Sequence, residues 1–365
     1  MKKALVILIL LAFVGGGLFA QTVAVAGQIE AGIAVVKQEA AEKVSFGIVS
    51  PTAWVDGQRT QLLFTAANND GTAGLLLRFR YDAFPTSNAG LAIHRGFAWL
   101  KFFDGMLEFR GGRYETTMAN YDFAGDDLGV QYGVIALISP IDMITIGFGG
   151  FSPASLTEFA TYEDGGLGIW GGLAANVPGL LGARLQLSFQ DIGTHASLSA
   201  NITALDAFPI ILTAWMRNLD EFGDFGWFAV HAMIGVNIID NLSINVGGTI
   251  GMAMWDETDP FIGAGAYLTY ALGNVVPRLD FWFISGGTYN YAAGLTPLGA
   301  TIYWGRASWN SDQTYINIRP SVQFRVNSAC YLDTGVVVNF DMGDVPAAGG
   351  DGLSYGVFAA VRVNF

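Results

Sequence analysis

Apolar and polar residues alternate along most of this chain, as they do in a β-strand with one face in an apolar environment and the other in water. A clear example spans residues 97–110, where two alternating segments flank Asp104-Gly105. Asp-Gly at this place predicts a tight hairpin, because glycine accepts the positive φ angle that the turn requires. In the second strand Phe109 falls on one face, and Glu108 and Arg110 fall on the other.

The same two-strand unit recurs six more times. The expected pairs are 130–138 with 144–151, 167–177 with 181–190, 196–204 with 210–217, 227–238 with 242–254, 262–271 with 275–284, and 315–326 with 330–340. Longer connections join the hairpins at 115–127, 152–164, 218–226, 255–260, 286–312 and 341–352, whereas the link at 191–193 is short. Short turns at one end and long loops at the other are typical of a transmembrane β-barrel.

The strand count follows from these pairs. Seven hairpins give fourteen strands, and segments 353–365 and 73–81 make sixteen. Segment 61–67 and a first strand within 28–49 would make eighteen, although 28–42 also fits a short helix. The predicted fold class is all-β: a closed transmembrane antiparallel up-and-down β-barrel of 16–18 strands, an even number, with short periplasmic turns and long extracellular loops. A soluble β-sandwich or β-propeller is the alternative, but aromatic residues near many strand ends favour the barrel.

The N-terminus has the pattern of a secretory signal peptide. Two lysines precede an apolar stretch at residues 4–13, and small residues follow. The stretch is short for a membrane helix, which needs ~20 apolar residues, so an N-terminal anchor is the weaker alternative. We expect a signal peptide at 1–20, with cleavage after Ala20 or as late as Ala26. A single barrel domain is expected at 21–365.

Composition excludes several function classes. The 31 acidic residues outnumber the 18 basic ones, which argues against a nucleic-acid partner. Cys330 is the single cysteine, so no intramolecular disulfide can form. The sequence has no H-E-x-x-H or C-x-x-C motif, and G-x-G-x-x-G at 166–171 lies within an alternating strand segment. We therefore expect no metal, no cofactor, no catalytic residue and no enzymatic activity.

Charged residues within the expected strands fall opposite the apolar face. An arginine facing lipid would cost ~2–4 kcal/mol at the bilayer midplane, so these residues are expected to line the lumen. The candidates are Arg78, Arg80, Glu108, Arg110, Arg184, Arg217, Arg278, Asp280, Arg319, Arg325, Asp333 and Arg362.

The lumen candidates include nine arginines and three acids, and this excess indicates a function. A barrel of sixteen or more strands leaves an aqueous channel, and charged rings set the selectivity of a pore. The sequence therefore predicts passive diffusion of small hydrophilic solutes with an anion preference. Acidic residues in the long loops would oppose that preference. A second hypothesis is that the arginines pair with acids and brace the wall.

The C-terminal segment ends the chain on an aromatic residue. Tyr355, Val357, Ala359, Val361, Val363 and Phe365 share one face of the expected strand. This pattern resembles the insertion signal of Gram-negative outer-membrane β-barrel proteins, with Tyr355, Val361, Val363 and Phe365 as its matching residues. Over its whole mature length the chain resembles porin-like members of that family.

The resemblance implies a bacterial outer-membrane location in contact with outer-membrane lipid. It also implies recognition of the C-terminal strand by the barrel-assembly machinery, small hydrophilic solutes as partners, and a homotrimer as one oligomeric state. Two other functions stay open: a structural or surface-binding, adhesin-like barrel, and a transporter of apolar solutes.

Overall fold

A computed structural model describes most of the strands and short turns of the chain. The described residues are 22–39, 42–49, 58–83, 91–115, 130–152, 168–190, 193–217, 227–253, 260–285, 288–289, 307–308, 314–327, 329–342 and 352–365. Most of the long connections expected from the sequence lie outside these ranges, as do the acids expected there, except Asp341, which is the last residue of a strand rather than part of a loop.

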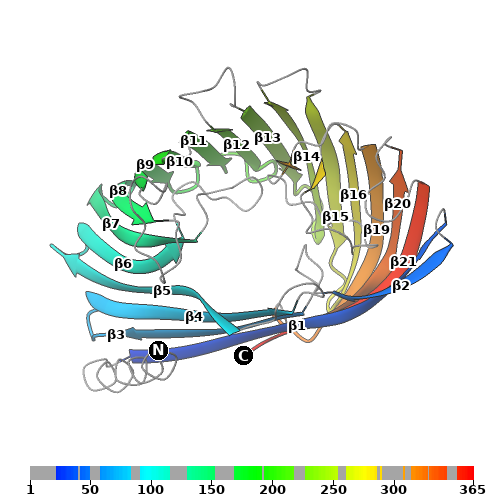
Figure 1. Cartoon of the computed structure of the whole chain (residues 1–365), viewed down its shortest axis with the longest axis horizontal. Helices are drawn as coiled ribbons and strands as arrows, with labels where there is room; N and C mark the ends of the chain where they lie inside the picture. Colours follow the sequence, from blue (N-terminus) through cyan, green and yellow to red (C-terminus); the bar gives the residue numbers. More distant parts are fainter. Residues whose placement is uncertain are drawn as a thin grey trace.

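Nineteen strands form one antiparallel sheet that curls round into a closed wall (Figure 1). The strands are β1 (Thr22–Gln38), β2 (Lys43–Val49), β3 (Gln58–Ala67), β4 (Ala73–Ala83), β5 (Leu91–Phe102), β6 (Leu107–Glu115), β7 (Val130–Ile141), β8 (Ile144–Ser152), β9 (Gly168–Val177), β10 (Leu181–Gln190), β11 (Gly193–Ile202), β12 (Ile210–Arg217), β13 (Trp227–Val236), β14 (Leu242–Ala253), β15 (Phe261–Tyr270), β16 (Val275–Ser285), β19 (Thr314–Arg325), β20 (Tyr331–Asp341) and β21 (Gly352–Asn364). A separate pair, β17 (Thr288–Tyr289) and β18 (Ala307–Ser308), belongs to the connection between β16 and β19. Among the described residues there is no helix long and apolar enough to cross a membrane.

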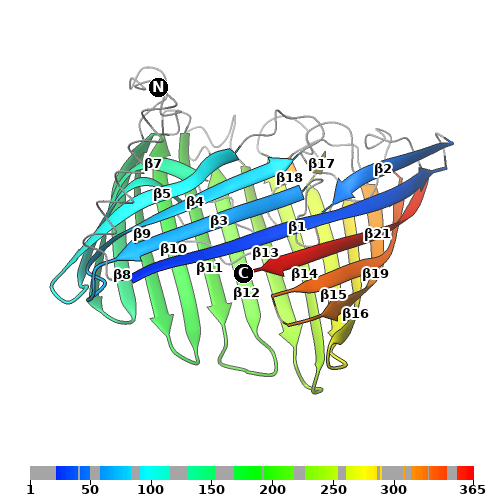
Figure 2. The same ribbon diagram turned by 90° about the horizontal axis from the view of Figure 1, so that it is seen from below.

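The first strand closes the barrel. One edge of β1 pairs with β21, from Gln28 opposite Asn364 to Gln38 opposite Ser354. The other edge is shared, because β3 pairs with its first half and β2 with its second half. Figure 2 shows β2 continuing along β1 beyond the end of β3. The closed ring therefore contains eighteen strands, which confirms the upper end of the predicted range.

The helical alternative for residues 28–42 is wrong, because most of this segment lies in β1. The strand begins at Thr22, earlier than the sequence suggested. Extended backbone is favoured here because β1 has strand partners along both of its edges over most of its length.

The two faces of the wall differ in chemistry. Outward positions carry exposed apolar side chains, such as Ile33 (66 % exposed), Phe148 (52 %) and Val357 (57 %). The opposite face carries buried polar side chains that include Glu30, Asp280 and Asn317. An apolar exterior around a polar interior is the reverse of a soluble protein and suits a wall surrounded by lipid.

The turn and seam geometries explain two sequence features. The β5–β6 turn contains Asp104-Gly105 as expected, and Gly105 has a φ angle of 89°. At the seam Phe365 and Gly27 exchange backbone hydrogen bonds of 2.7 and 3.0 Å. The ring of Phe365 covers Gly27 so closely that a Cβ atom on Gly27 would collide with it. A larger residue at position 27 would therefore displace the ring of Phe365 where it crosses the first strand.

Candidate functional site: the lumen wall

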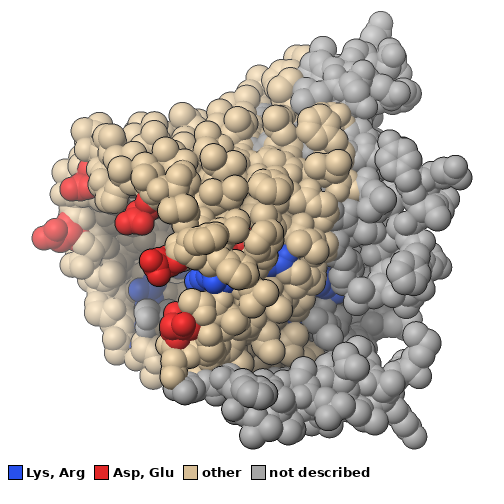
Figure 3. Space-filling model, turned by 90° about the vertical axis from the view of Figure 1, so that its left-hand side faces the viewer, with Lys and Arg blue, Asp and Glu red and all other residues tan. Residues whose placement is uncertain are grey.

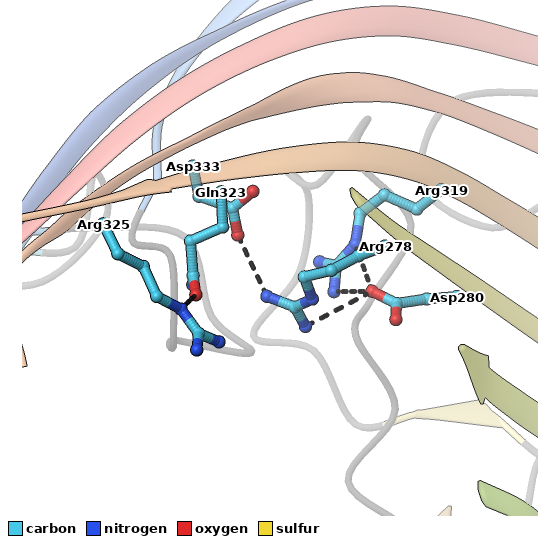
Figure 4. A network of polar contacts seen from close by, with 6 residues as sticks. All are labelled: Arg278, Asp280, Arg319, Gln323, Arg325 and Asp333. Carbon is cyan, nitrogen blue, oxygen red and sulfur yellow. Dashed lines mark hydrogen bonds and ion pairs between the residues drawn. The ribbon is translucent and has the colours of Figure 1, made fainter. Parts of the chain in front are cut away.

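The inner face of the barrel carries an ion-pair network on β16, β19 and β20. Asp280 accepts hydrogen bonds from Nη2 and Nε of Arg319 at 2.6 and 3.0 Å. Arg278 reaches the same carboxylate oxygen at 3.7 Å and contacts Asp333 at 3.1 Å (Figure 4). Asp280 is fully buried and Asp333 is 3 % exposed. Each buried carboxylate therefore has at least one guanidinium partner, which is what makes its burial tolerable.

The network continues across the closing seam. Nε of Arg362, on β21, lies 3.7 Å from a carboxylate oxygen of Glu30, on β1. Gln28 donates a hydrogen bond to the same oxygen of Glu30, which is completely buried. Arg325 donates to Oε1 of Gln323 at 2.5 Å. We call Glu30, Arg278, Asp280, Arg319, Arg325, Asp333 and Arg362 the braced sector. Its four arginines face three carboxylates, so its net charge is small.

A second group of charges on β4–β6 is less balanced. Arg78 and Arg95 lie directly opposite each other across β4 and β5. Lys101 lies opposite Glu108, and Nε of Arg110 contacts Glu108 at 2.6 Å. We call these residues, Arg78, Arg95, Lys101, Glu108 and Arg110, the basic sector. It has four basic groups and one acidic group. Figure 3 shows basic side chains within a hollow of the molecule and acidic side chains around its edge.

An aromatic patch adjoins the basic sector. The guanidinium of Arg110 lies over the ring of Phe97 at 5.6 Å from its centre. Phe97 and Leu137 pack against Ile135 and Trp170, which are only 4 % and 1 % exposed. The pairing of a cation with an aromatic face is a favourable contact. This part of the inner wall therefore places a positive charge beside the partly buried ring of Phe97.

The structure separates the predicted lumen candidates into groups. Arg278, Asp280, Arg319 and Asp333 come together in one network, and Glu108 pairs with Arg110. Arg184 lies on β10 opposite Ser199. Arg80 and Arg217 belong to β4 and β12, but their side chains lie outside the described part.

Three charged residues of the two sectors were missed by the sequence reasoning. Glu30 lies in the segment where strand and helix could not be separated. Arg95 and Lys101 share the phase of Phe97 in β5, so extending the alternation from Phe97 in both directions would have found them. These residues add one acid to the braced sector and two basic groups to the basic sector.

The inner wall has the chemistry of non-covalent recognition. It offers guanidinium and ammonium donors, carboxylate and amide acceptors, and an aromatic surface. Among the described residues no group of three or more His, Cys, Asp and Glu side chains is placed to hold a metal ion.

A closed, eighteen-stranded antiparallel barrel with a polar inner wall is the fold of outer-membrane porins. No family model matches the sequence, and no curated protein matches it either.

Three solved structures from Pseudomonas aeruginosa share the fold. OccK5 (OpdH) has a TM-score of 0.60 at 8 % identity and covers 95 % of this chain and 99 % of its own. OccD3 (OpdP) has a TM-score of 0.58 at 9 % identity, with coverages of 95 % and 92 %. OpdK with vanillate has a TM-score of 0.57 at 9 % identity, with coverages of 95 % and 100 %. At these identities the similarity establishes the fold alone.

Proposed function

We propose that the chain forms an outer-membrane channel for passive diffusion of small hydrophilic solutes, with a preference for anions. The observation that carries this proposal is an eighteen-stranded closed wall that is apolar outside and polar inside. A barrel of this size is wide enough to leave an aqueous channel along its axis. The proposal includes export by the N-terminal signal peptide and insertion through the C-terminal strand. A homotrimer is the proposed assembly.

The anion preference rests on the basic sector. In the braced sector carboxylates lie beside most of the arginines, so the field of those cations is largely cancelled nearby. In the basic sector Arg78, Arg95, Lys101 and Arg110 are accompanied by one acid, Glu108. β4 and β6 also contain Asp82 and Glu115, whose side chains lie outside the described part. Positive side chains along a pore wall lower the barrier for anions and raise it for cations. We thus assign solute selection to the basic sector and stabilisation of the wall to the braced sector.

The aromatic patch narrows the class of solute. One of the similar structures holds vanillate, an aromatic carboxylate. A solute of that kind would place its carboxylate near Arg110 and its ring near Phe97, whose face already accepts a cation. We propose small organic anions with an apolar part as preferred solutes.

The test is ion selectivity in a planar bilayer. The purified protein is inserted and the reversal potential is measured under a KCl gradient. We expect an anion-selective potential that moves toward zero in Arg110→Gln. The matched control is Arg278→Gln in the braced sector, whose guanidinium lies beside the carboxylates of Asp280 and Asp333 and which is therefore expected to change the potential less. A cation-selective potential in the unaltered protein would contradict the anion preference while leaving the channel itself intact.

A further inference from the structure

The short turns at one end of the barrel are unexpectedly apolar. In four of them an apolar residue directly precedes an aspartate. We call these four turns the turn rim; they contain Phe103-Asp104, Ile141-Asp142, Leu205-Asp206 and Ile239-Asp240. The apolar members are well exposed: Phe103 is 75 % exposed, Leu205 60 % and Ile239 60 %. Turns that project into water are normally built from small polar residues and glycine, so this pattern needs a cause.

The exposed apolar surface of the turn rim continues that of the outer wall. Phe102, the last residue of β5, is 45 % exposed, and its ring contacts Phe109 of β6 at 6.1 Å between ring centres. Phe103 follows immediately and begins the turn. In the β7–β8 turn Ile141 (49 % exposed) and Met143 (43 %) flank Asp142 in the same way. At the β5–β6 and β7–β8 turns the apolar outer face of the wall therefore continues directly into apolar turn residues.

One turn at the same end has the opposite character. The β3–β4 connection reads Asn68-Asn69-Asp70-Gly71-Thr72. Its polar groups bond to one another: Thr72 donates to Asp70 at 2.8 Å, and Asn68 donates to Thr72 at 2.9 Å. A turn of ordinary polar chemistry is therefore available in this barrel, and the apolar turns are not a requirement of the fold.

We propose that the turn rim is inserted into the phospholipid layer of the membrane surface at the short-turn end. Continuity with the lipid-facing wall identifies lipid as the occupant. The residue composition agrees, because each of the four turns has one carboxylate and no Lys or Arg. A carboxylate can stay in the hydrated headgroup layer, near the ammonium groups of ethanolamine lipids, while the adjacent apolar side chains enter the acyl boundary. This inference rests on the membrane location in the proposed function and is independent of the pore's selectivity.

The test measures the depth of individual turn positions in vesicles. The native thiol is removed by Cys330→Ala, and single cysteines are introduced as Leu205→Cys and Ile239→Cys. Asn69→Cys is the matched control in the polar turn, and Val246→Cys, at a wall position 46 % exposed, is the lipid-facing reference. Each variant is labelled with a nitroxide and reconstituted into phosphatidylethanolamine–phosphatidylcholine vesicles. Collision rates are then measured with oxygen, which concentrates in lipid, and with a polar nickel chelate, which stays in water.

At positions 205 and 239 we expect a several-fold lower nickel collision rate than at 69, with an oxygen collision rate close to that at 246. Nickel and oxygen rates equal to those at 69 would overturn the proposal, since the turns would then lie in water. Low rates for both reagents would also overturn it, because they indicate burial against protein, such as a second copy of the chain. Only variants that keep heat-modifiable mobility in gels, a sign of the folded barrel, are compared. Phe103→Cys supplies a third position if one variant fails to fold.

Discussion

Replacement of Asp280 by asparagine tests whether the braced sector holds the wall together. Asp280 is fully buried and accepts two hydrogen bonds from Arg319, and Arg278 lies 3.7 Å from the same oxygen. Asp280→Asn keeps the size and one carbonyl acceptor but removes the negative charge. Two guanidinium groups then remain close together beside a neutral amide, so we expect a less stable barrel.

The magnitude follows from the partners that remain. Removal of one member of a buried ion pair costs about 3–5 kcal/mol. Arg319 and Arg278 keep 18 % and 21 % of their side chains exposed, so water compensates part of the loss. Arg278 also keeps its 3.1 Å contact with Asp333. We therefore expect Asp280→Asn to lower the free energy of unfolding by about 2–3 kcal/mol, below the full value for a dry pair.

The assay is reversible urea unfolding in lipid vesicles, followed by tryptophan fluorescence and by the folded band in gels without heating. Asp240→Asn is the control, since this exposed turn carboxylate should change stability by less than about 0.5 kcal/mol. The double variant with Arg319→Gln should lose less than the sum of the two single changes, because the two residues share one interaction. If Asp280→Asn unfolds at the same urea concentration as the unaltered protein, the bracing role is refuted.

Three further outcomes are expected from the turn, the seam and the N-terminus. The hydroxyl and backbone N–H of Thr72 hydrogen-bond the carboxylate of Asp70 and hold its pKa below the ordinary value of 3.8. The contribution of Asp70 to stability is thus present above pH 3.8 and is lost as the pH falls through the lowered pKa of the folded protein. An NMR titration of the Asp70 carboxyl should give a midpoint below pH 3.8. A midpoint at pH 3.8 would contradict this prediction. Gly27→Val should displace the ring of Phe365 and reduce the yield of folded barrel in refolding assays, whereas equal yields would exclude a role for this contact. Residues 22–26 pair with β3, so we expect the mature protein to begin at Gln21 rather than after Ala26, as N-terminal mass spectrometry can determine.

Most of the fold could be read from the sequence because one physical constraint repeats along it. A wall between lipid and water imposes alternation on every strand, and turn residues mark where each strand ends. The β5–β6 hairpin and the final strand therefore lie where the pattern placed them. β1 was harder to read, because much of its first half is alanine, glycine and valine on both faces, which also suits a helix start.

The partners within the lumen could not be read in the same way. Alternation shows which face a charge occupies but not which charge it meets. Arg319 and Asp280 are 39 residues apart, and Arg278 and Asp333 are 55 apart. Glu30 meets Arg362 because the first and last strands become neighbours on closure. These contacts depend on the register of pairs of strands, and a register is fixed by the whole sheet.

The most direct test of a water-filled channel is swelling of vesicles that contain the purified, folded protein. Vesicles are diluted into isotonic solutions of sugars of increasing size, and the rate of swelling is recorded by light scattering. The proposed channel predicts rates well above those of protein-free vesicles, falling steadily as the sugars become larger. Swelling no faster than in protein-free vesicles, with the barrel shown to be inserted and folded, would contradict it and favour a structural or surface-binding role.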